Sequence, residues 1–219
     1  MKIALGAAAF LVIWGLGGES VNFDGLKPGA APPHWTFVSS HPTDRARWQI
    51  RFDPSAPSRG NILGKDVGGI AEGDFPMAIF DKVVCGDGDL TVKFRIDGGG
   101  RTKTAGVVWR YTDPENYYLL HFSADQKNIM LFRVKDGRIE PIEVTSGRRR
   151  TTAITRDIGV GQWYIAKVSF RGDRIRAFFG YRELFDATDS SLMNPGKTGV
   201  WTRGRTTASF DDFRIDRKN

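Results

Sequence analysis

The chain has 219 residues, of which 40% are hydrophobic and 26% charged, values that are ordinary for a globular protein and exclude a largely disordered chain. The 26 glycines and the 12% aromatic share favour many turns and strands, and this length suits one all-β domain around a single core. The formal net charge of +7 is typical of an ordinary solvated basic face, and an affinity for an acidic polysaccharide is the alternative; the sequence has no helix-turn-helix, zinc-finger or RNA-recognition signature. We therefore expect no nucleic-acid partner.

The first 19 residues have the pattern of a secretory signal peptide. One lysine precedes an apolar run over residues 3–16, and small residues follow it. The run is shorter than the about 20 residues that span a membrane, so we expect the leader to be removed and no stable membrane insertion afterwards. The mature chain is expected to begin between Gly18 and Val21. The expected protein is exported to the bacterial periplasm or the extracellular space, with residues 20–219 forming one domain.

Cys85 is the only cysteine, so an exported chain of this sequence has no internal disulfide and depends on its core for stability. No histidine or basic cluster is adjacent to it in the sequence. We expect a small buried hydrophobic side chain rather than a nucleophile.

The region from residue 22 to residue 64 is interrupted too often by proline and glycine for a helix, and it predicts loops and short edge strands. From Asp81 onward, runs rich in β-branched and aromatic residues are bounded by turn residues such as those in "TDPEN", "KDGR" and "NPGK". The predicted strands are 90–96, 105–111, 116–122, 128–134, 163–170, 174–180, 199–202 and 209–215. This spacing predicts an all-β, antiparallel sandwich whose successive strands are linked by hairpins.

Alternation along the predicted strands assigns side chains to faces. The side chains expected to face the core are Tyr164, Ala166, Val168, Phe170, Ile175, Ala177 and Phe179. The opposite face of the same two strands then carries Trp163, Ile165, Lys167, Ser169, Arg174, Arg176 and Phe178. In "GVVWRY", the pattern places Val107, Trp109 and Tyr111 on one side and Val108 and Arg110 on the other.

Four stretches together resemble a known family. These are "AGVVWRYTDPENYYLLHF", "NIMLFRVKDGR", "GQWYIAKVSFRGDRIRAFFG" and "PGKTGVWTRGRTTASFDDFRI". They are similar to exported bacterial jelly-roll domains of the concanavalin A-like (laminin G-like) superfamily, nearest to the 3-keto-disaccharide hydrolase domain family. The resemblance extends over residues 20–216 and implies a jelly-roll sandwich of the lectin and glucanase type. It also implies an association with carbohydrate.

The motifs of the common hydrolases are missing from the sequence. Retaining glucanases of this superfamily carry two carboxylates on one strand, about 5 Å apart across the sugar, and no strand here has that Glu-x-Asp-x-Glu pattern. The nearest approaches are Glu140 with Glu143 and Glu183 with Asp186, beside turns. No Gly-x-Ser-x-Gly elbow, His-Glu-x-x-His helix or phosphate-binding loop is present. The three histidines are widely separated in the sequence.

Three aspartates form a candidate cation site. Asp211 and Asp212 in "FDDF" are expected to face opposite sides of a strand, so one of them needs a partner inside the protein. Asp24 in "NFDG" could join it around a structural calcium ion, with loop carbonyls completing the shell. The alternative is that these aspartates cap turns or pair with arginines. No other cofactor is expected.

In a two-layer sandwich, the outer face of the concave sheet is a common glycan groove, where aromatic rings stack on sugars and charged groups contact hydroxyls. The candidate lining residues are Arg110, His121, Lys167, Arg176 and Trp201. For each of them, an ordinary surface or core role is the alternative.

Three functions are compatible with these observations. The first is an exported domain that binds glycan without catalysis. The second, implied by the resemblance, is a hydrolase of 3-keto glycosides, in which a single base such as His121 or Asp212 would be enough for elimination. The third is an adhesion module of the laminin G type with protein partners. A shallow aromatic groove would favour binding, and a deep pocket with a titratable group beside Arg110 would favour an enzyme.

Overall fold

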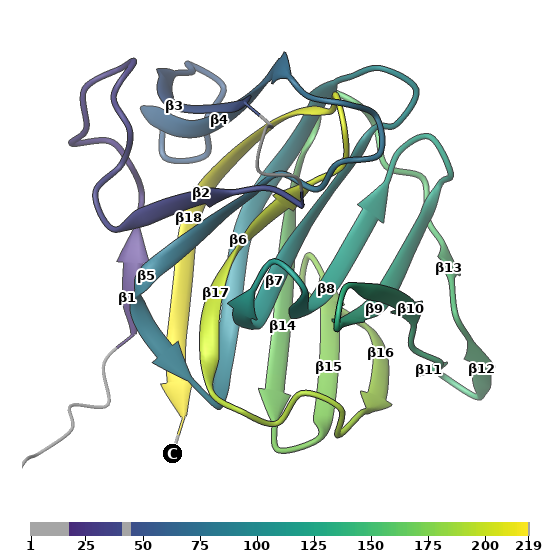
Figure 1. The fold of residues 1–219 in the computed structure, drawn as a ribbon. Helices are drawn as coiled ribbons and strands as arrows, with labels where there is room; N and C mark the ends of the chain where they lie inside the picture. Colours follow the sequence, from purple (N-terminus) through teal and green to yellow (C-terminus); the bar gives the residue numbers. More distant parts are fainter. Residues whose placement is uncertain (1–17, 41–44, 219) are drawn as a thin grey trace, which may run out of the picture.

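The computed structural model describes residues 18–40 and 45–218, which form eighteen strands and no helix in two sheets packed face to face (Figure 1). The sheet here called sheet A has ten strands, in the order β12-β11-β16-β15-β14-β6-β18-β4-β3, with β1 also paired to β18. Sheet B has eight strands, in the order β10-β9-β8-β7-β17-β5-β2, with β13 paired to β9. The expected leader, apart from Gly18 and Glu19, lies outside the described residues.

The strands of sheet A are β1 (Glu19–Val21), β3 (Arg45–Phe52), β4 (Asn61–Gly69), β6 (Asp87–Gly98), β11 (Val144–Ser146), β12 (Arg149–Thr151), β14 (Trp163–Arg171), β15 (Arg174–Phe179), β16 (Arg182–Thr188) and β18 (Thr207–Lys218). The strands of sheet B are β2 (Trp35–Val38), β5 (Met77–Cys85), β7 (Thr104–Asp113), β8 (Asn116–Ser123), β9 (Asn128–Lys135), β10 (Arg138–Pro141), β13 (Ile154–Thr155) and β17 (Gly196–Thr202). Each strand pairing between them is antiparallel.

The all-β antiparallel sandwich and all eight predicted strands are confirmed. The N-terminal region differs from its prediction of loops and short edge strands, because β4 has nine residues and lies inside sheet A between β18 and β3. Figure 1 also shows β1 beside the end of β18, so the first and last strands of the described chain are neighbours.

The core between the sheets consists of the alternate side chains of the long strands. Val168 and Phe170 of β14 and Ile175 and Ala177 of β15 are buried there, as alternation predicts. Trp109 of β7 stacks on Phe170 with their ring centroids 6.0 Å apart, which joins sheet B to sheet A.

Cys85 is buried in this core, and burial raises the pKa of its thiol to about 11. It is therefore a small hydrophobic residue of the core, as its sequence context indicates. Among the described residues, none belongs to a helix long and apolar enough to cross a membrane.

A candidate ligand-binding groove on sheet A

The five expected lining residues do not form one surface. Trp201 of β17 is only 1% exposed and lies in a second apolar cluster, on the face of sheet B that points away from sheet A. Phe75, from the segment that precedes β5, stacks on the indole at a centroid distance of 5.5 Å. The expectation that Trp201 is an exposed sugar platform is therefore wrong, because a segment distant in sequence covers it.

Arg110 is also buried, with 2% of its surface exposed. It lies in a β-bulge of β7 with a φ of 49°. Its guanidinium donates hydrogen bonds to the carbonyl oxygens of Gly86, Leu192 and Gly172, at 2.9, 2.9 and 2.6 Å. Arg110 thus connects three loops at one end of the sandwich and is not a ligand contact, which corrects its assignment to the groove.

His121 of β8 is buried against the rings of Trp201 and Phe132, with centroid distances of 5.8 and 5.5 Å. Burial, with a smaller contribution from Arg203, lowers the pKa of His121 to about 4. A neutral imidazole enclosed by aromatic rings cannot reach an external sugar. The expectation that His121 lines a groove or acts as a base there is wrong for that reason.

Lys167 and Arg176 do lie together, on the outer face of sheet A. They are on the neighbouring strands β14 and β15, and each has its cationic group 5.4 Å from the ring centroid of Phe178. Lys167 and Arg176 therefore share a surface on the opposite sheet from Trp201 and His121. Lys167 lines the groove described next, and Arg176 does not.

Two adjoining hollows form a groove over this part of sheet A. Their volumes are about 490 and 480 Å³, and they share Lys93, Ile165 and Gly180. The first hollow is also lined by Pro57, Trp163, Tyr164 and Phe179. The second is also lined by Ser20, Thr91, Lys167, Tyr181, Asp212, Phe213 and Arg214. The strands β6 and β14 supply the floor, and the β15–β16 turn and the strands β18 and β1 supply the sides.

Tyr181 is the most exposed aromatic residue of the rim, with 97% of its surface accessible. It follows Gly180 in the two-residue turn between β15 and β16, and Gly180 has a φ of 62° that suits glycine. A phenol ring held at a rim by a tight turn is available to contact a ligand.

A β-bulge in β18 brings Asp212 into the groove. Phe210 and Phe213 both reach the core, so the two residues between them stay on the outer side of the sheet. Asp212 has a φ of 46°, and its carboxylate is 2.6 Å from the ammonium of Lys93. The expectation that Asp211 and Asp212 face opposite sides is wrong, because simple alternation does not hold across a bulge.

Asp211 and Asp24 hold the loop of residues 53–60 that ends the groove. Asp211 is fully buried and accepts a hydrogen bond of 3.0 Å from the amide of Ser58. Asp24 accepts hydrogen bonds from the Ser58 hydroxyl at 3.0 Å and the Asn61 amide at 2.9 Å. Burial raises the pKa of the Asp211 carboxyl above its usual value.

These contacts bear on the calcium hypothesis. Within residues 18–40 and 45–218, no three acidic, histidine or cysteine side chains are placed to hold a metal ion. Hydroxyl and amide donors occupy Oδ1 of Asp24, backbone amides occupy both carboxylate oxygens of Asp211, and Asp212 pairs with Lys93. The alternative that Asp24 and Asp211 cap a loop is the one that the structure supports.

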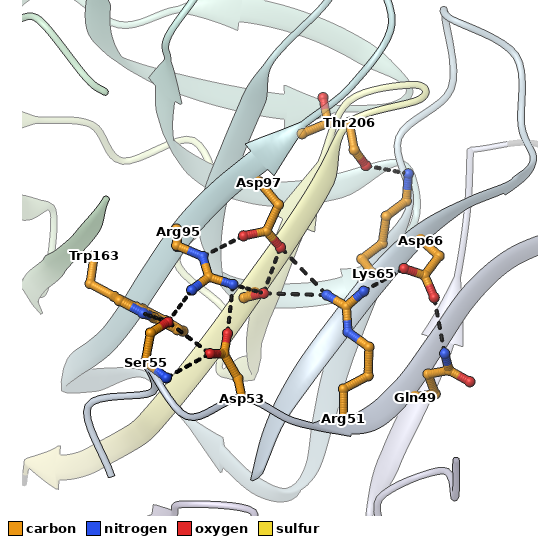
Figure 2. Close-up of polar contacts among 11 residues, drawn as sticks. Gln49, Arg51, Asp53, Ser55, Lys65, Asp66, Arg95, Asp97, Trp163 and Thr206 are labelled. Carbon is orange, nitrogen blue, oxygen red and sulfur yellow. Dashed lines mark hydrogen bonds and ion pairs between the residues drawn. The ribbon is translucent and has the colours of Figure 1, made fainter. Parts of the chain in front are cut away.

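A network of charged side chains fastens the same loop to sheet A (Figure 2). Arg95 of β6 binds Asp53 at 2.6 Å and also pairs with Asp97. Its guanidinium lies 4.8 Å from the ring centroid of Trp163, and Ser55 contacts both side chains. Burial opposes ionisation of Asp53, but hydrogen bonds from Ser55 and Arg95 hold its pKa below the usual value. Trp163 is thereby fixed at one end of the groove.

Arg51 of β3 extends this network. It binds Asp66 at 2.5 Å and approaches Asp97 at 3.4 Å (Figure 2). A Cβ atom at Gly64 would overlap the guanidinium of Arg51, so glycine is needed for the arginine to lie flat across β4.

Sequence reasoning identified part of this groove and missed part. The alternation of β14 already places Trp163, Ile165 and Lys167 on the outer face. Neither the rim position of Tyr181 nor the bulge at Asp212 has a clear signal in the sequence. An aspartate pair inside a terminal strand is the one local hint of the bulge.

Solved structures share this fold. Carbohydrate-binding module CBM66 from Bacillus subtilis has a TM-score of 0.59 and 20% identity, over 83% of this chain and 94% of that one. Domain 4 of AbnA, a GH43 extracellular arabinanase from Geobacillus stearothermophilus in complex with arabinotriose, has a TM-score of 0.61 and 12% identity, over 90% of each chain. A protein of unknown function with a galectin-like fold from Bacillus subtilis has a TM-score of 0.55 and 11% identity, over 84% and 90%.

At these identities the likeness establishes the fold, a jelly-roll sandwich of the galectin-like and carbohydrate-binding-module type. No protein-family model and no curated protein matches this sequence.

Proposed function

We propose that the protein binds carbohydrate in the groove over sheet A and does not cleave it. The observation that carries this proposal is the exposed ring of Tyr181 on the rim, with Trp163 at one end of the groove and Lys93, Asp212 and Lys167 between them. Flat rings stack on sugar faces, and charged groups form hydrogen bonds with hydroxyls, so this combination suits a glycan.

Two structural neighbours support the proposal by their descriptions. One is a carbohydrate-binding module, and another is an arabinanase domain solved with arabinotriose. The groove found here is independent support, because its position follows from this chain's own side chains.

The absence of cleavage is proposed from the carboxylates. Glycosidases of the paired-carboxylate type need two such groups about 5 to 10 Å apart on either side of the bond. Among the described residues that line the two hollows, Asp212 is the one carboxylate, and it is paired with Lys93.

A glycan array probed with the protein tests this function, and Tyr181→Ala is the informative variant. Phe52→Ala is the matched control, since Phe52 is 65% exposed at the end of β3 and does not line the groove. Tyr181→Ala should weaken glycan binding about tenfold, the scale of a lost aromatic contact, while Phe52→Ala leaves it unchanged. Equal binding by both variants would place the glycan site elsewhere.

The second candidate is a hydrolase of 3-keto glycosides, as the resemblance to that domain family implies. One observation favours it, namely that Asp212 lies in the groove beside a cation. Asp212 would remove the proton next to the keto group, and Lys93 would stabilise the negative charge that develops. Turnover of a 3-keto disaccharide that is abolished by Asp212→Asn would establish this activity, and no turnover would exclude it.

If the protein is instead an adhesion module that binds other proteins, we expect it to bind none of the glycans on the array.

We also propose that the protein is exported after removal of its leader, to the periplasm or the extracellular space. Glu19 is the first residue of β1 and pairs with Ile215 of β18, so a cut after Glu19 would shorten a strand. The proposed start remains between Gly18 and Val21, and within that range a start at Gly18 or Glu19 would keep β1 whole. N-terminal sequencing of the protein from the envelope fraction tests this, and a chain that starts at Met1 would contradict it.

A further inference from the structure

We propose that the groove binds an acidic sugar unit, and that the ammonium of Lys167 contacts its carboxylate or sulfate group. This inference rests on the proposed glycan binding and adds the chemical class of the ligand.

Three cations and one carboxylate line the second hollow, and two of those cations already have partners. Lys93 pairs with Asp212 at 2.6 Å, and Arg214 binds both carboxylate oxygens of Asp216 at 2.7 Å. Lys167 is different: within the described residues its ammonium forms no ion pair of 4.0 Å or less, although, against the opposing effect of burial, its charge helps to lower the pKa of the nearby Asp89 carboxyl. Its positive charge is therefore the one that a ligand could neutralise within this hollow.

The carboxylate nearest to Lys167 along the neighbouring strand, that of Asp89, forms ion pairs with other cations. Asp89 of β6 lies opposite Ser169, two residues along β14 from Lys167. It binds Arg171 at 3.0 Å and Lys218 at 3.8 Å. Arg176, the other cation beside Phe178, pairs with Glu183. The carboxylates around Lys167 are thus in ion pairs with other cations, and Lys167 interacts with Asp89 only at longer range.

Packing holds the lysine in place. Lys167 lies opposite Thr91 on one side and Phe178 on the other, and its Nζ is 5.4 Å from the centroid of the phenyl ring. The aliphatic stem covers apolar surface while the charged end remains in the groove. An ammonium held over a ring loses less side-chain entropy on binding than a free one, which favours a specific contact with an anion.

The remainder of the hollow fits a sugar ring that bears such a group. Ile165 supplies apolar floor, Tyr181 supplies a ring at the rim, and Asp212 accepts hydrogen bonds from hydroxyls. A neutral sugar would leave the Lys167 ammonium without a partner. The excess of basic over acidic residues would in addition speed the encounter with an acidic glycan.

The experiment measures affinity by calorimetry for two kinds of acidic probe. Uronate oligosaccharides (galacturonate, mannuronate, guluronate and hyaluronan fragments) are compared with their methyl esters, which keep the rings and lose the charge. Sulfated oligosaccharides of the heparin type are compared with their desulfated forms. The two arms distinguish a carboxylate from a sulfate. Lys167→Met keeps the apolar stem, Lys167→Arg keeps the charge, and Lys135→Met is the control, since Lys135 is exposed on β9 of sheet B.

The expected result is that at least one acidic probe binds about tenfold tighter than its neutral form, the scale of a charge-assisted hydrogen bond. Lys167→Met should remove that difference, whereas Lys167→Arg and Lys135→Met should retain it. One contrary result is that glycans bind with an affinity that Tyr181→Ala lowers, while their acidic and neutral forms bind equally well. That result would overturn the inference and leave the proposed function standing. A preference for acid that survives in Lys167→Met also overturns it. Failure of every acidic and neutral glycan to bind would overturn both.

Discussion

The ammonium of Lys93 on β6 and the carboxylate of Asp212 on β18 are 2.6 Å apart where the two hollows of the groove meet. The pair exists because the β18 bulge places Asp212 on the outer side of sheet A with a positive φ. A glycine is the residue that best tolerates this backbone conformation.

Replacing Asp212 separates the backbone effect from the ion pair. Asp212→Ala and Asp212→Gly both remove the carboxylate, but only alanine retains a Cβ at a φ of 46°. We expect Asp212→Ala to be less stable than Asp212→Gly by about 1 kcal/mol in chemical denaturation. The opposite order would show that the bulge is not strained at this position.

Truncation of Trp201 is expected to affect stability and not binding. Its indole is buried with Phe75 and His121, so Trp201→Ala should lower the free energy of unfolding by about 3 to 5 kcal/mol through the cavity that it leaves. Glycan affinity of the folded protein should be unchanged. Tyr181→Ala should show the reverse pattern, with a stability change within about 0.5 kcal/mol. Melting curves and affinities of the two variants are the measurement.

His121 should make the protein sensitive to acid. Burial lowers its pKa to about 4, below the value of 6.5 for the unfolded chain, so the unfolded state binds a proton first as the pH falls. Stability is therefore present above pH 6.5 and is lost between pH 6.5 and 4, by up to about 3 kcal/mol. His121→Phe, compared with the wild type over this range by chemical denaturation, should lack this component. Parallel pH profiles of the two proteins would contradict the assignment.

Lys65 should make the free energy of unfolding depend on pH in the alkaline range. It is fully buried, and its ammonium donates hydrogen bonds of 2.7 Å to the carbonyl oxygens of Gly204 and Thr206. Burial lowers the pKa of Lys65 to about 8, partly offset by Asp66 and Glu72. Between pH 8 and 10.5 the unfolded state holds the proton and the folded state does not, so stability should rise with pH by up to about 3 kcal/mol from this group. The difference in unfolding free energy between wild type and Lys65→Met should show that rise.

Removal of divalent cations should leave the melting temperature unchanged. Asp24 and Asp211 are joined through Ser58, which donates a hydrogen bond to each of them. Ser58→Ala should cost about 1 kcal/mol by removing the hydroxyl donor to Asp24. Thermal unfolding with EDTA and then with added calcium is the measurement. A marked increase in melting temperature on adding calcium would restore the cation hypothesis.

The strands and the faces of their core residues are properties that the sequence alone determines. In β14 and β15, alternation separates Val168, Phe170, Ile175 and Ala177 from the outer residues because each side chain's direction depends only on its position in the strand. The buried state of Cys85 likewise follows from its immediate neighbours. These features are local, so a local pattern predicts them.

The position of the groove was decided by the tertiary structure. Trp201 has the alternation of an outer-face residue, but Phe75 covers it, and no local pattern reports such a contact. Bulges at Arg110 and Asp212 change the direction of both side chains, because pairing with a neighbouring strand, and not the residue's own propensity, sets where an extra residue is inserted. The groove therefore depends on which segments of the chain cover each sheet, and this is known only once the two sheets are packed.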